Sequence, residues 1–296
     1  MTPMKQRLRP PKATPVRTIR TAIKRLIPPT LRHELRVARQ KMAMLSGIRR
    51  SLGWWSTSRY LLAPLWNELT RARYYRLTAR ESSYSLLMRR GSSDSEVFRQ
   101  IFVEREYDCL SDLTNVRTVL DCGGNIGLAT MWFLSRHAQA TAVVVEPAPE
   151  NIASMRANLA PFHDRVKVVE TGVWEVAARL VVERGNFGDG REWSYTVREC
   201  GEGEQHDLVA ADMCTLLDLT AGQGNDVDIV KIDIEGAERQ IFADPTAKWI
   251  GRARNLVIEI HGEEAEQLVS AAFPSAEWER SASGELSVFR RRDTSV

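Results

Sequence analysis

Short apolar runs alternate with amphipathic segments along the last two thirds of the chain. The runs predict strands, and the segments between them, with apolar residues three and four apart, predict helices. Because the runs are nearly continuous, they predict a parallel sheet covered by helices on both faces, a doubly wound α/β fold. The expected strands are 117–122, 141–146, 166–170, 227–233 and 255–261, and the expected helices are 126–136, 150–159, 237–242 and 263–273.

Two segments depart from this alternation. Residues 178–183 and 195–200 predict a β excursion around a glycine-rich tip at 185–190. Near the C-terminus, 276–280 and 285–290 flank Ser-Ala-Ser-Gly and predict a hairpin that closes the sheet.

The N-terminal part has another pattern. Residues 1–29 contain six prolines among basic residues and are expected to be extended. Residues 30–47 predict an amphipathic helix capped by Thr30. Its apolar stripe either packs on the main domain or lies on a membrane surface. We assign 1–53 as a basic N-terminal arm with an amphipathic helix.

Aromatic and arginine side chains are concentrated in 54–84. Such residues can stack on bases, but at helical spacing they more often form a packing face. Ser93 or Asp94 can cap a further helix. The apolar residues expected on its inward face are Val97, Phe98, Ile101 and Phe102. We therefore assign 54–112 as an aromatic and Arg-rich helical lead-in, and 113–296 as the α/β domain.

Charge is distributed unevenly, although the 296 residues carry a net charge of only +3. Residues 1–50 contain fourteen Lys and Arg and one acid, a net +13, so the remainder sums to 3 − 13 = −10. A basic arm of this kind either is solvated or contacts an anionic membrane or another acidic partner. Nucleic acid is the less expected partner.

Cysteine usage and hydropathy indicate the compartment. The four cysteines form no C-x-x-C pair, so they predict neither a disulfide framework nor a zinc site and fit a reducing compartment. No run approaches the ~20 apolar residues that span a bilayer, and the start lacks the apolar segment of a secretory signal. We expect a cytoplasmic protein, with peripheral membrane contact through the arm as an open alternative.

The first strand of the α/β domain runs into a glycine-rich turn, Asp121-x-Gly123-x-Asn125-x-Gly127. A strand, such a turn and a helix form a nucleotide site, in which glycine permits positive φ and close approach of a ligand. The spacing differs from the G-x-G-x-x-G of dinucleotide folds. An acid at the strand tip suits a ligand that brings a cation, whereas pyrophosphate would be repelled. S-adenosylmethionine, with its ammonium and sulfonium groups, is such a ligand.

The next two strand ends extend this cofactor prediction. Glu146 ends the second strand, where an acid accepts hydrogen bonds from ribose hydroxyls, although it can also simply cap a helix. The third strand ends near Thr171, where an adenine edge would lie. The residues assigned to the cofactor are Asp121, Gly123, Asn125, Gly127, Glu146 and Thr171.

The later strands supply candidate catalytic residues. With a period of two, Lys231 shares a face with Asp233, and Glu259 shares one with His261. We assign Asp233 and His261 as catalytic, His261 being the candidate base, although a lone histidine is more often structural. Lys231 and Glu259 can pair across neighbouring strands, so neither need be catalytic, and Glu235 is assigned to a helix N-terminus. A divalent ion held by Asp233, Glu259 and His261 is chemically compatible, but no metal is assigned.

Taken in order, these motifs resemble the FkbM-type S-adenosylmethionine-dependent methyltransferases over roughly 88–272. They are Asp-Cys-Gly-Gly-Asn-Ile-Gly from Asp121, Glu146-Pro147 with Asn151, Lys-Ile-Asp-Ile-Glu-Gly-Ala-Glu from Lys231, Ile-Glu-Ile-His ending at His261, and a lead-in from Ser93 to Tyr107. The resemblance implies a Rossmann-like class I methyltransferase sheet of seven mostly parallel strands, with an antiparallel last strand. The helical, basic N-terminal extension and the 177–200 excursion lie outside what the resemblance explains. The resemblance also implies methylation of a hydroxyl on a small molecule or glycan, such as a sugar or secondary metabolite.

Methyl transfer from sulfonium to oxygen is an in-line displacement, so positioning supplies much of the rate, and a base or metal must help remove the hydroxyl proton. Two other functions remain open. A NAD(P)-dependent oxidoreductase can use a similar sheet, but the acid at Asp121 and the glycine spacing disfavour it. A non-enzymatic, methyltransferase-like module tethered by its basic arm is the other alternative, and the intact motifs favour catalysis over it.

Overall fold

The computed structural model describes residues 42, 44–54, 56–58, 60–62, 72–80, 84–183, 196–244 and 246–292. The chain divides into two compact units, Met1–Ser46 and Gly47–Val296. Most of the helix expected at 30–47, and the glycine-rich tip expected at 185–190, lie outside the described residues. The fold described below is that of the second unit.

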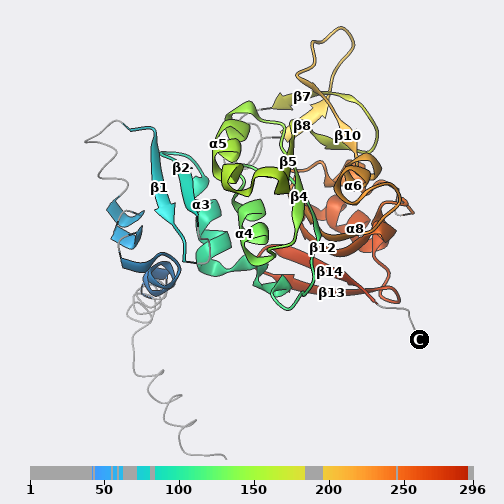
Figure 1. The fold of residues 1–296 in the computed structure, drawn as a ribbon. Helices are drawn as coiled ribbons and strands as arrows, with labels where there is room; N and C mark the ends of the chain where they lie inside the picture. The colour runs from blue at the N-terminus through green and yellow to red at the C-terminus, as the bar shows by residue number, and fades with distance from the viewer. Residues whose placement is uncertain are drawn as a thin grey trace, which may run out of the picture. The chain divides into compact units, whose positions relative to one another are not determined.

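A seven-stranded sheet forms the centre of this unit, in the order β13-β14-β12-β11-β3-β4-β5 (Figure 1). All pairings are parallel except those of β14, which runs antiparallel to both β12 and β13. The strands are β3 (Thr118–Cys122), β4 (Thr141–Val145), β5 (Val166–Val169), β11 (Val227–Ile232), β12 (Ala253–Glu259), β13 (Trp278–Ser283) and β14 (Leu286–Arg291). The predicted class I methyltransferase sheet, including its closing hairpin, is confirmed.

Helices cover both faces of the sheet because neighbouring strand residues point to opposite sides. In β3, Val119 belongs to the core that contains α4 and α5, whereas Leu120 belongs to the core that contains α6 and α8. Both residues are fully buried, which explains the continuous apolar run. The helices are α4 (Leu128–Arg136), α5 (Pro149–Leu159), α6 (Met213–Ala221), α7 (Glu238–Ile241) and α8 (Glu263–Ala272).

The prediction that 54–112 is helical is wrong over its middle part. Tyr74–Thr78 (β1) and Ser85–Arg89 (β2) form an antiparallel hairpin. Its buried residues Leu77, Leu86 and Met88 follow a period of two, which suits a strand with one face against a core. The helical prediction for the following segment is confirmed, because α3 (Asp94–Phe98) continues into a π-helical turn, Arg99–Glu104, with a 3₁₀ turn at Glu106–Leu110.

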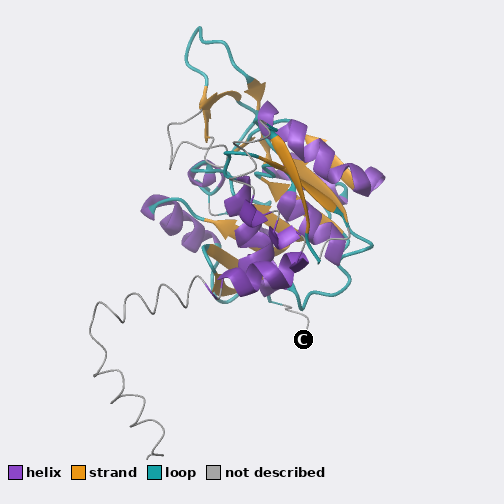
Figure 2. Cartoon of the chain, turned by 90° about the vertical axis from the view of Figure 1, so that its left-hand side faces the viewer, coloured by secondary structure: helices purple, strands orange, loops and turns teal. Residues whose placement is uncertain are grey.

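An excursion of short strands follows β5, as expected from 178–183 and 195–200. β7 (Arg179–Glu183) pairs with β8 (Thr196–Glu199) and with β9 (Leu208–Val209), and these strands stand out from the body of the unit (Figure 2). β6 (Val173–Trp174) pairs in parallel with β10 (Ala211–Asp212). Among the described residues, no helix is both long and apolar enough to cross a bilayer.

Candidate active site

A cavity of about 400 Å³ lies at the carboxyl ends of β3, β4, β11 and β12. The chain order of the sheet reverses between β3 and β11, the position where open α/β sheets bind ligands. The residues assigned from the sequence that line the cavity are Gly123, Asn125, Glu146, Thr171, Asp233 and His261. The two that do not line it are Asp121, which lies within β3, and Gly127, which directly precedes α4.

The glycine-rich turn is formed by residues with positive φ: 81° at Gly123, 48° at Asn125 and 83° at Gly127. A Cβ on Gly123 would lie 1.7 Å from the carbonyl oxygen of Asp233, so only glycine lets the turn approach the end of β11. A Cβ on Gly127 would lie 3.0 Å from Leu159 of α5. Gly123 therefore shapes the cavity, whereas Gly127 permits close helix packing behind it.

Asp121 does not face the cavity in the way that the sequence suggests. Its fully buried carboxylate accepts a hydrogen bond from Thr130 Oγ1 at 2.5 Å and lies 3.3 Å from Lys231 Nζ. Burial disfavours a charged amine, but the carboxylates of Asp233 and Asp121 hold the pKa of Lys231 well above its ordinary value. The charge of Asp121 is thus compensated within the protein.

Lys231 contacts three parts of the site: Asp121 in β3, the glycine-rich turn, and Asp233 after β11. Its Nζ lies 3.3 Å from Asp233 Oδ2 and donates a hydrogen bond of 2.5 Å to the carbonyl of Gly123. The pairing of Lys231 with Glu259 that the sequence allows is replaced by these contacts with Asp121 and Asp233. The reason is register, because Lys231 is paired with Asp121 of β3 on one side and with Val257, not Glu259, of β12 on the other.

Glu146 is held at the cavity wall by three donors and is 4% exposed. Its Oε2 accepts from the backbone N–H of Asn125 at 2.8 Å, and its Oε1 accepts from Ala148 N–H and Asn151 Nδ2, both at 3.0 Å. Burial raises the pKa of Glu146 to about 7, although these donors oppose the rise. A carboxylate oxygen accepts two hydrogen bonds, so Oε2 has capacity for one more. The buried Oδ1 of Asn125 beside it has no hydrogen-bond partner within the described part of the chain.

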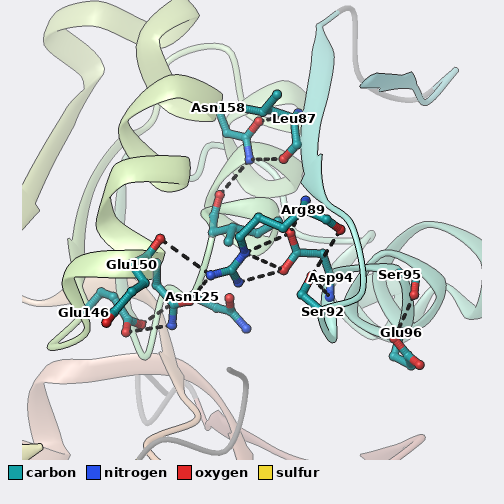
Figure 3. Close-up of polar contacts among 12 residues, drawn as sticks. Leu87, Arg89, Ser92, Asp94, Ser95, Glu96, Asn125, Glu146, Glu150 and Asn158 are labelled. Atoms are coloured by element: carbon teal, nitrogen blue, oxygen red, sulfur yellow. Dashed lines mark hydrogen bonds and ion pairs between the residues drawn. The ribbon is translucent and has the colours of Figure 1, made fainter. Parts of the chain in front are cut away.

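The lead-in segment supports this carboxylate through Arg89, a residue not assigned from the sequence (Figure 3). Arg89 Nη1 donates to Asn151 Oδ1 at 2.9 Å, and Arg89 Nη2 lies 2.7 Å from the fully buried carboxylate of Asp94. Asn151 in turn donates to Glu146. Arg89 ends β2 and contacts Asn151 in the first turn of α5, and strand periodicity carries no signal for this contact.

Acidic side chains surround the opposite end of the cavity. His261 Nδ1 lies 3.1 Å from Glu238 Oε1, while its Nε2 lies 3.4 Å from Glu235 and 3.5 Å from Glu259. Burial lowers the pKa of His261, but hydrogen bonds with Glu238 and Glu259 outweigh it and raise the pKa to about 11. The imidazole is therefore protonated at neutral pH in this arrangement, and a base role for His261 requires a change in the charge around it.

Several carboxyl groups that line the cavity were not assigned to the site from the sequence. Burial raises the pKa of Glu235 to about 8, and burial together with the charges of Glu259 and Asp233 raises the pKa of Glu106 to about 7. Glu235 has a positive φ of 52°, which turns it into the cavity instead of into a regular helix N-terminus. Glu106 and Glu285 come from segments remote in sequence, and no pattern links them to the strand ends.

The fold and the cavity define a class I methyltransferase domain. The Methyltransferase FkbM domain matches residues 121–278, which is more than half of the 296 residues. The chain therefore belongs to the FkbM methyltransferase family. Methyltransferases of this family and fold generally use S-adenosylmethionine.

Individual methyltransferases are similar to this chain. Methyltransferase 1 of Beauveria bassiana (strain ARSEF 2860) is 23% identical over 181 residues, covering 55% of this chain and 72% of its own length. Methyltransferase sdnD of Sordaria araneosa is 25% identical over 195 residues, covering 55% of this chain and 73% of its own length. The solved structure of Methyltransferase FkbM from Methylobacillus flagellatus KT matches with a TM-score of 0.39 and 14% identity, over 86% of this chain and 60% of that one.

Proposed function

We propose that this protein transfers the methyl group of S-adenosylmethionine to a hydroxyl group of a sugar, glycan or secondary metabolite. The observation that carries the proposal is the division of the cavity into two ends. One end is formed by the glycine-rich turn and Glu146, and the other by Asp233 and the acids around His261. A methyl donor and an acceptor need two adjoining subsites of this kind.

Residues of the first end fit the cofactor. Glu146 Oε2 has acceptor capacity for a ribose hydroxyl, and Asn125 Oδ1 is a buried acceptor with no hydrogen-bond partner among the described residues. Thr171 lines the wall beyond β5, where an adenine ring would lie. When bound, S-adenosylmethionine supplies an electrophilic methyl group on sulfonium. These residues hold and orient the donor, and Lys231 fixes the turn through the carbonyl of Gly123.

Residues of the second end fit a hydroxylated acceptor. The carboxylates of Asp233 and Glu259 line this end, and a carboxylate can accept a hydrogen bond from a hydroxyl group and take up the proton that an alcohol must release. Asp233 is adjacent to both ends, because its carboxylate contacts Lys231 while its backbone carbonyl abuts Gly123. We assign Asp233 as the residue that positions the acceptor oxygen toward the methyl group.

A direct assay tests the proposed function. Purified protein is incubated with methyl-labelled S-adenosylmethionine and fractionated host extract, and products are identified by mass analysis. The expected product is a hydroxylated small molecule or glycan that carries the label as a methyl ether, and Asp233→Asn should form it more slowly than wild type. Label on nitrogen, or in no product at all, would contradict the assignment.

We also propose a cytoplasmic protein whose basic arm contacts an anionic membrane surface or another acidic partner. The support is the net +13 of residues 1–50. Ile48 and Leu52 are buried in the core of the second unit, so a truncation should remove only residues 1–41. Full-length protein should bind anionic vesicles in a salt-sensitive way, and the truncated protein should not. Equal binding by both would exclude an electrostatic role for the arm.

A further inference from the structure

Three metal-ligating side chains converge at the acceptor end of the cavity. One donor atom each from Asp233, Glu259 and His261 lies within 4.8 Å of the others. The register of the sheet produces this arrangement, because Ile232 of β11 is paired with Ile258 of β12 and the residues that follow are therefore neighbours. His261 follows two residues later, just after β12 ends.

A buried carboxylate outside this group orients the histidine. Glu238, which is fully buried at the start of α7, lies 3.1 Å from His261 Nδ1, and the ring directs Nε2 toward Glu259. Histidines that bind metal ions typically donate their second N–H to such a carboxylate, which fixes the tautomer and the ring plane. Nδ1 is thereby committed to Glu238, and Nε2 lies near the carboxylates of Glu235 and Glu259. A donor atom of Asp233 lies within 4.8 Å of the donor atoms of Glu259 and His261.

The charges at this end also favour a cation. Besides Glu146, the acidic side chains that line the cavity are Glu106, Asp233, Glu235, Glu259 and Glu285. The ammonium group of Lys231 is shared between Asp233 and the buried Asp121. One lysine and one histidine therefore stand among several carboxylates, and a divalent ion would reduce their mutual repulsion.

We propose that Asp233, Glu259 and His261 bind a divalent first-row transition-metal ion, with Glu238 as the positioning residue for His261. Two carboxylate oxygens and one imidazole nitrogen suit such an ion and leave coordination positions open. The ion would displace the proton of His261 Nε2, so binding should release a proton and strengthen as the pH rises. Metal binding itself does not depend on the proposed function. Its role toward the acceptor does rest on it, namely to hold a hydroxyl group near Asp233 and to lower the pKa of that hydroxyl.

Calorimetric titration of the metal-stripped full-length protein with Mn²⁺ alone tests the site. We expect saturable binding at one site, weakened at least tenfold by Asp233→Asn, Glu259→Gln and His261→Asn. Glu238→Gln should weaken it by about 10- to 100-fold, as removal of an orienting carboxylate does elsewhere. Glu106→Gln is the matched control, since it removes one carboxylate of the same cavity outside the ligand set, and it should change the affinity by less than about threefold.

Three results would overturn the proposal: absence of saturable Mn²⁺ binding by wild type, unchanged affinity in the ligand variants, or a loss in Glu106→Gln as large as theirs. Wild type provides a further measurement if a variant does not fold. Bound Mn²⁺ should broaden the NMR signals of the His261 ring before those of the other histidines, and the reverse order would also refute the site. Because these titrations contain no S-adenosylmethionine, their outcome is separate from that of the methyl-transfer assay.

Discussion

Nζ of Lys231 lies 3.3 Å from Oδ1 of Asp121, and both residues are almost completely buried. The acid of the glycine-rich turn is therefore not an open counter-charge for a cationic ligand. Together with the bond from Lys231 to the carbonyl of Gly123, the pair fixes the turn that faces the cavity. The pair therefore acts on the cavity through the backbone of the turn.

Removal of either partner of this buried pair should destabilise the fold. Lys231→Met leaves the Asp121 carboxylate without its cation, and such a loss costs about 3–5 kcal/mol of unfolding free energy. The double variant Lys231→Met/Asp121→Asn removes both charges and should be less destabilised than the sum of the single variants. Urea unfolding of the four proteins measures the coupling, and strictly additive effects would show that the two side chains do not interact.

Cofactor affinity should depend on the ionisation of Glu146. Burial raises the pKa of this carboxyl to about 7, and only its ionised form has both oxygens free to accept. The affinity for S-adenosylhomocysteine should therefore be constant above pH 7 and fall by up to about tenfold per pH unit below it. Glu146→Gln should bind weakly with a much flatter profile. A wild-type affinity that stays constant from pH 8 down to pH 6 would exclude this linkage.

The pH dependence of the affinity for S-adenosylhomocysteine also tests the hydrogen bonds that link Arg89 to Asn151 and Asn151 to Glu146. Asn151→Ala removes a donor that stabilises the ionised carboxylate, so the midpoint should move to higher pH. Arg89→Lys keeps a charge beside Asp94 but loses the planar group that reaches Asn151, and it should shift the midpoint less. An unchanged midpoint in Asn151→Ala would assign Asn151 a purely structural role.

Gly123 and Gly203 offer a matched pair for the glycine-rich turn. Both have positive φ, 81° and 77°, but a Cβ on Gly203 would meet nothing within 4 Å, whereas one on Gly123 would lie 1.7 Å from Asp233 O. Gly203→Ala should cost only the strain of positive φ, about 1–2 kcal/mol. Gly123→Ala should cost more and abolish S-adenosylhomocysteine binding. Similar unfolding temperatures and retained binding in both variants would refute the close approach of the turn to β11.

The sheet was predictable from the sequence because its strands are buried on both faces. Val119 and Leu120 point to different cores, yet both must be apolar, so the run is visible without any structure. The β1–β2 hairpin was mispredicted because its apolar signal is short: Leu77, Leu86 and Met88 alternate with exposed or half-buried residues among many aromatic and arginine side chains. A five-residue strand gives little periodicity to detect.

The strand-end residues of the site were predictable for a similar reason. Carboxyl ends of parallel strands meet at one edge, so the acids at 146 and 233 were placed near a common cavity. Periodicity assigns a face but not a partner, and it could not show that Lys231 reaches Asp121 instead of Glu259. Glu235 was assigned to a helix N-terminus, and only its φ of 52° reveals that it turns into the cavity.

Calorimetric titration of the full-length protein with S-adenosylhomocysteine, with NADH titrated in parallel, tests cofactor binding in this cavity most directly. We predict saturable binding of S-adenosylhomocysteine at one site, affinity at least tenfold weaker in Glu146→Gln, and no binding of NADH. Saturable binding of NADH without binding of S-adenosylhomocysteine, or equal affinity in wild type and Glu146→Gln, would contradict the assignment of the cavity to a methyl donor.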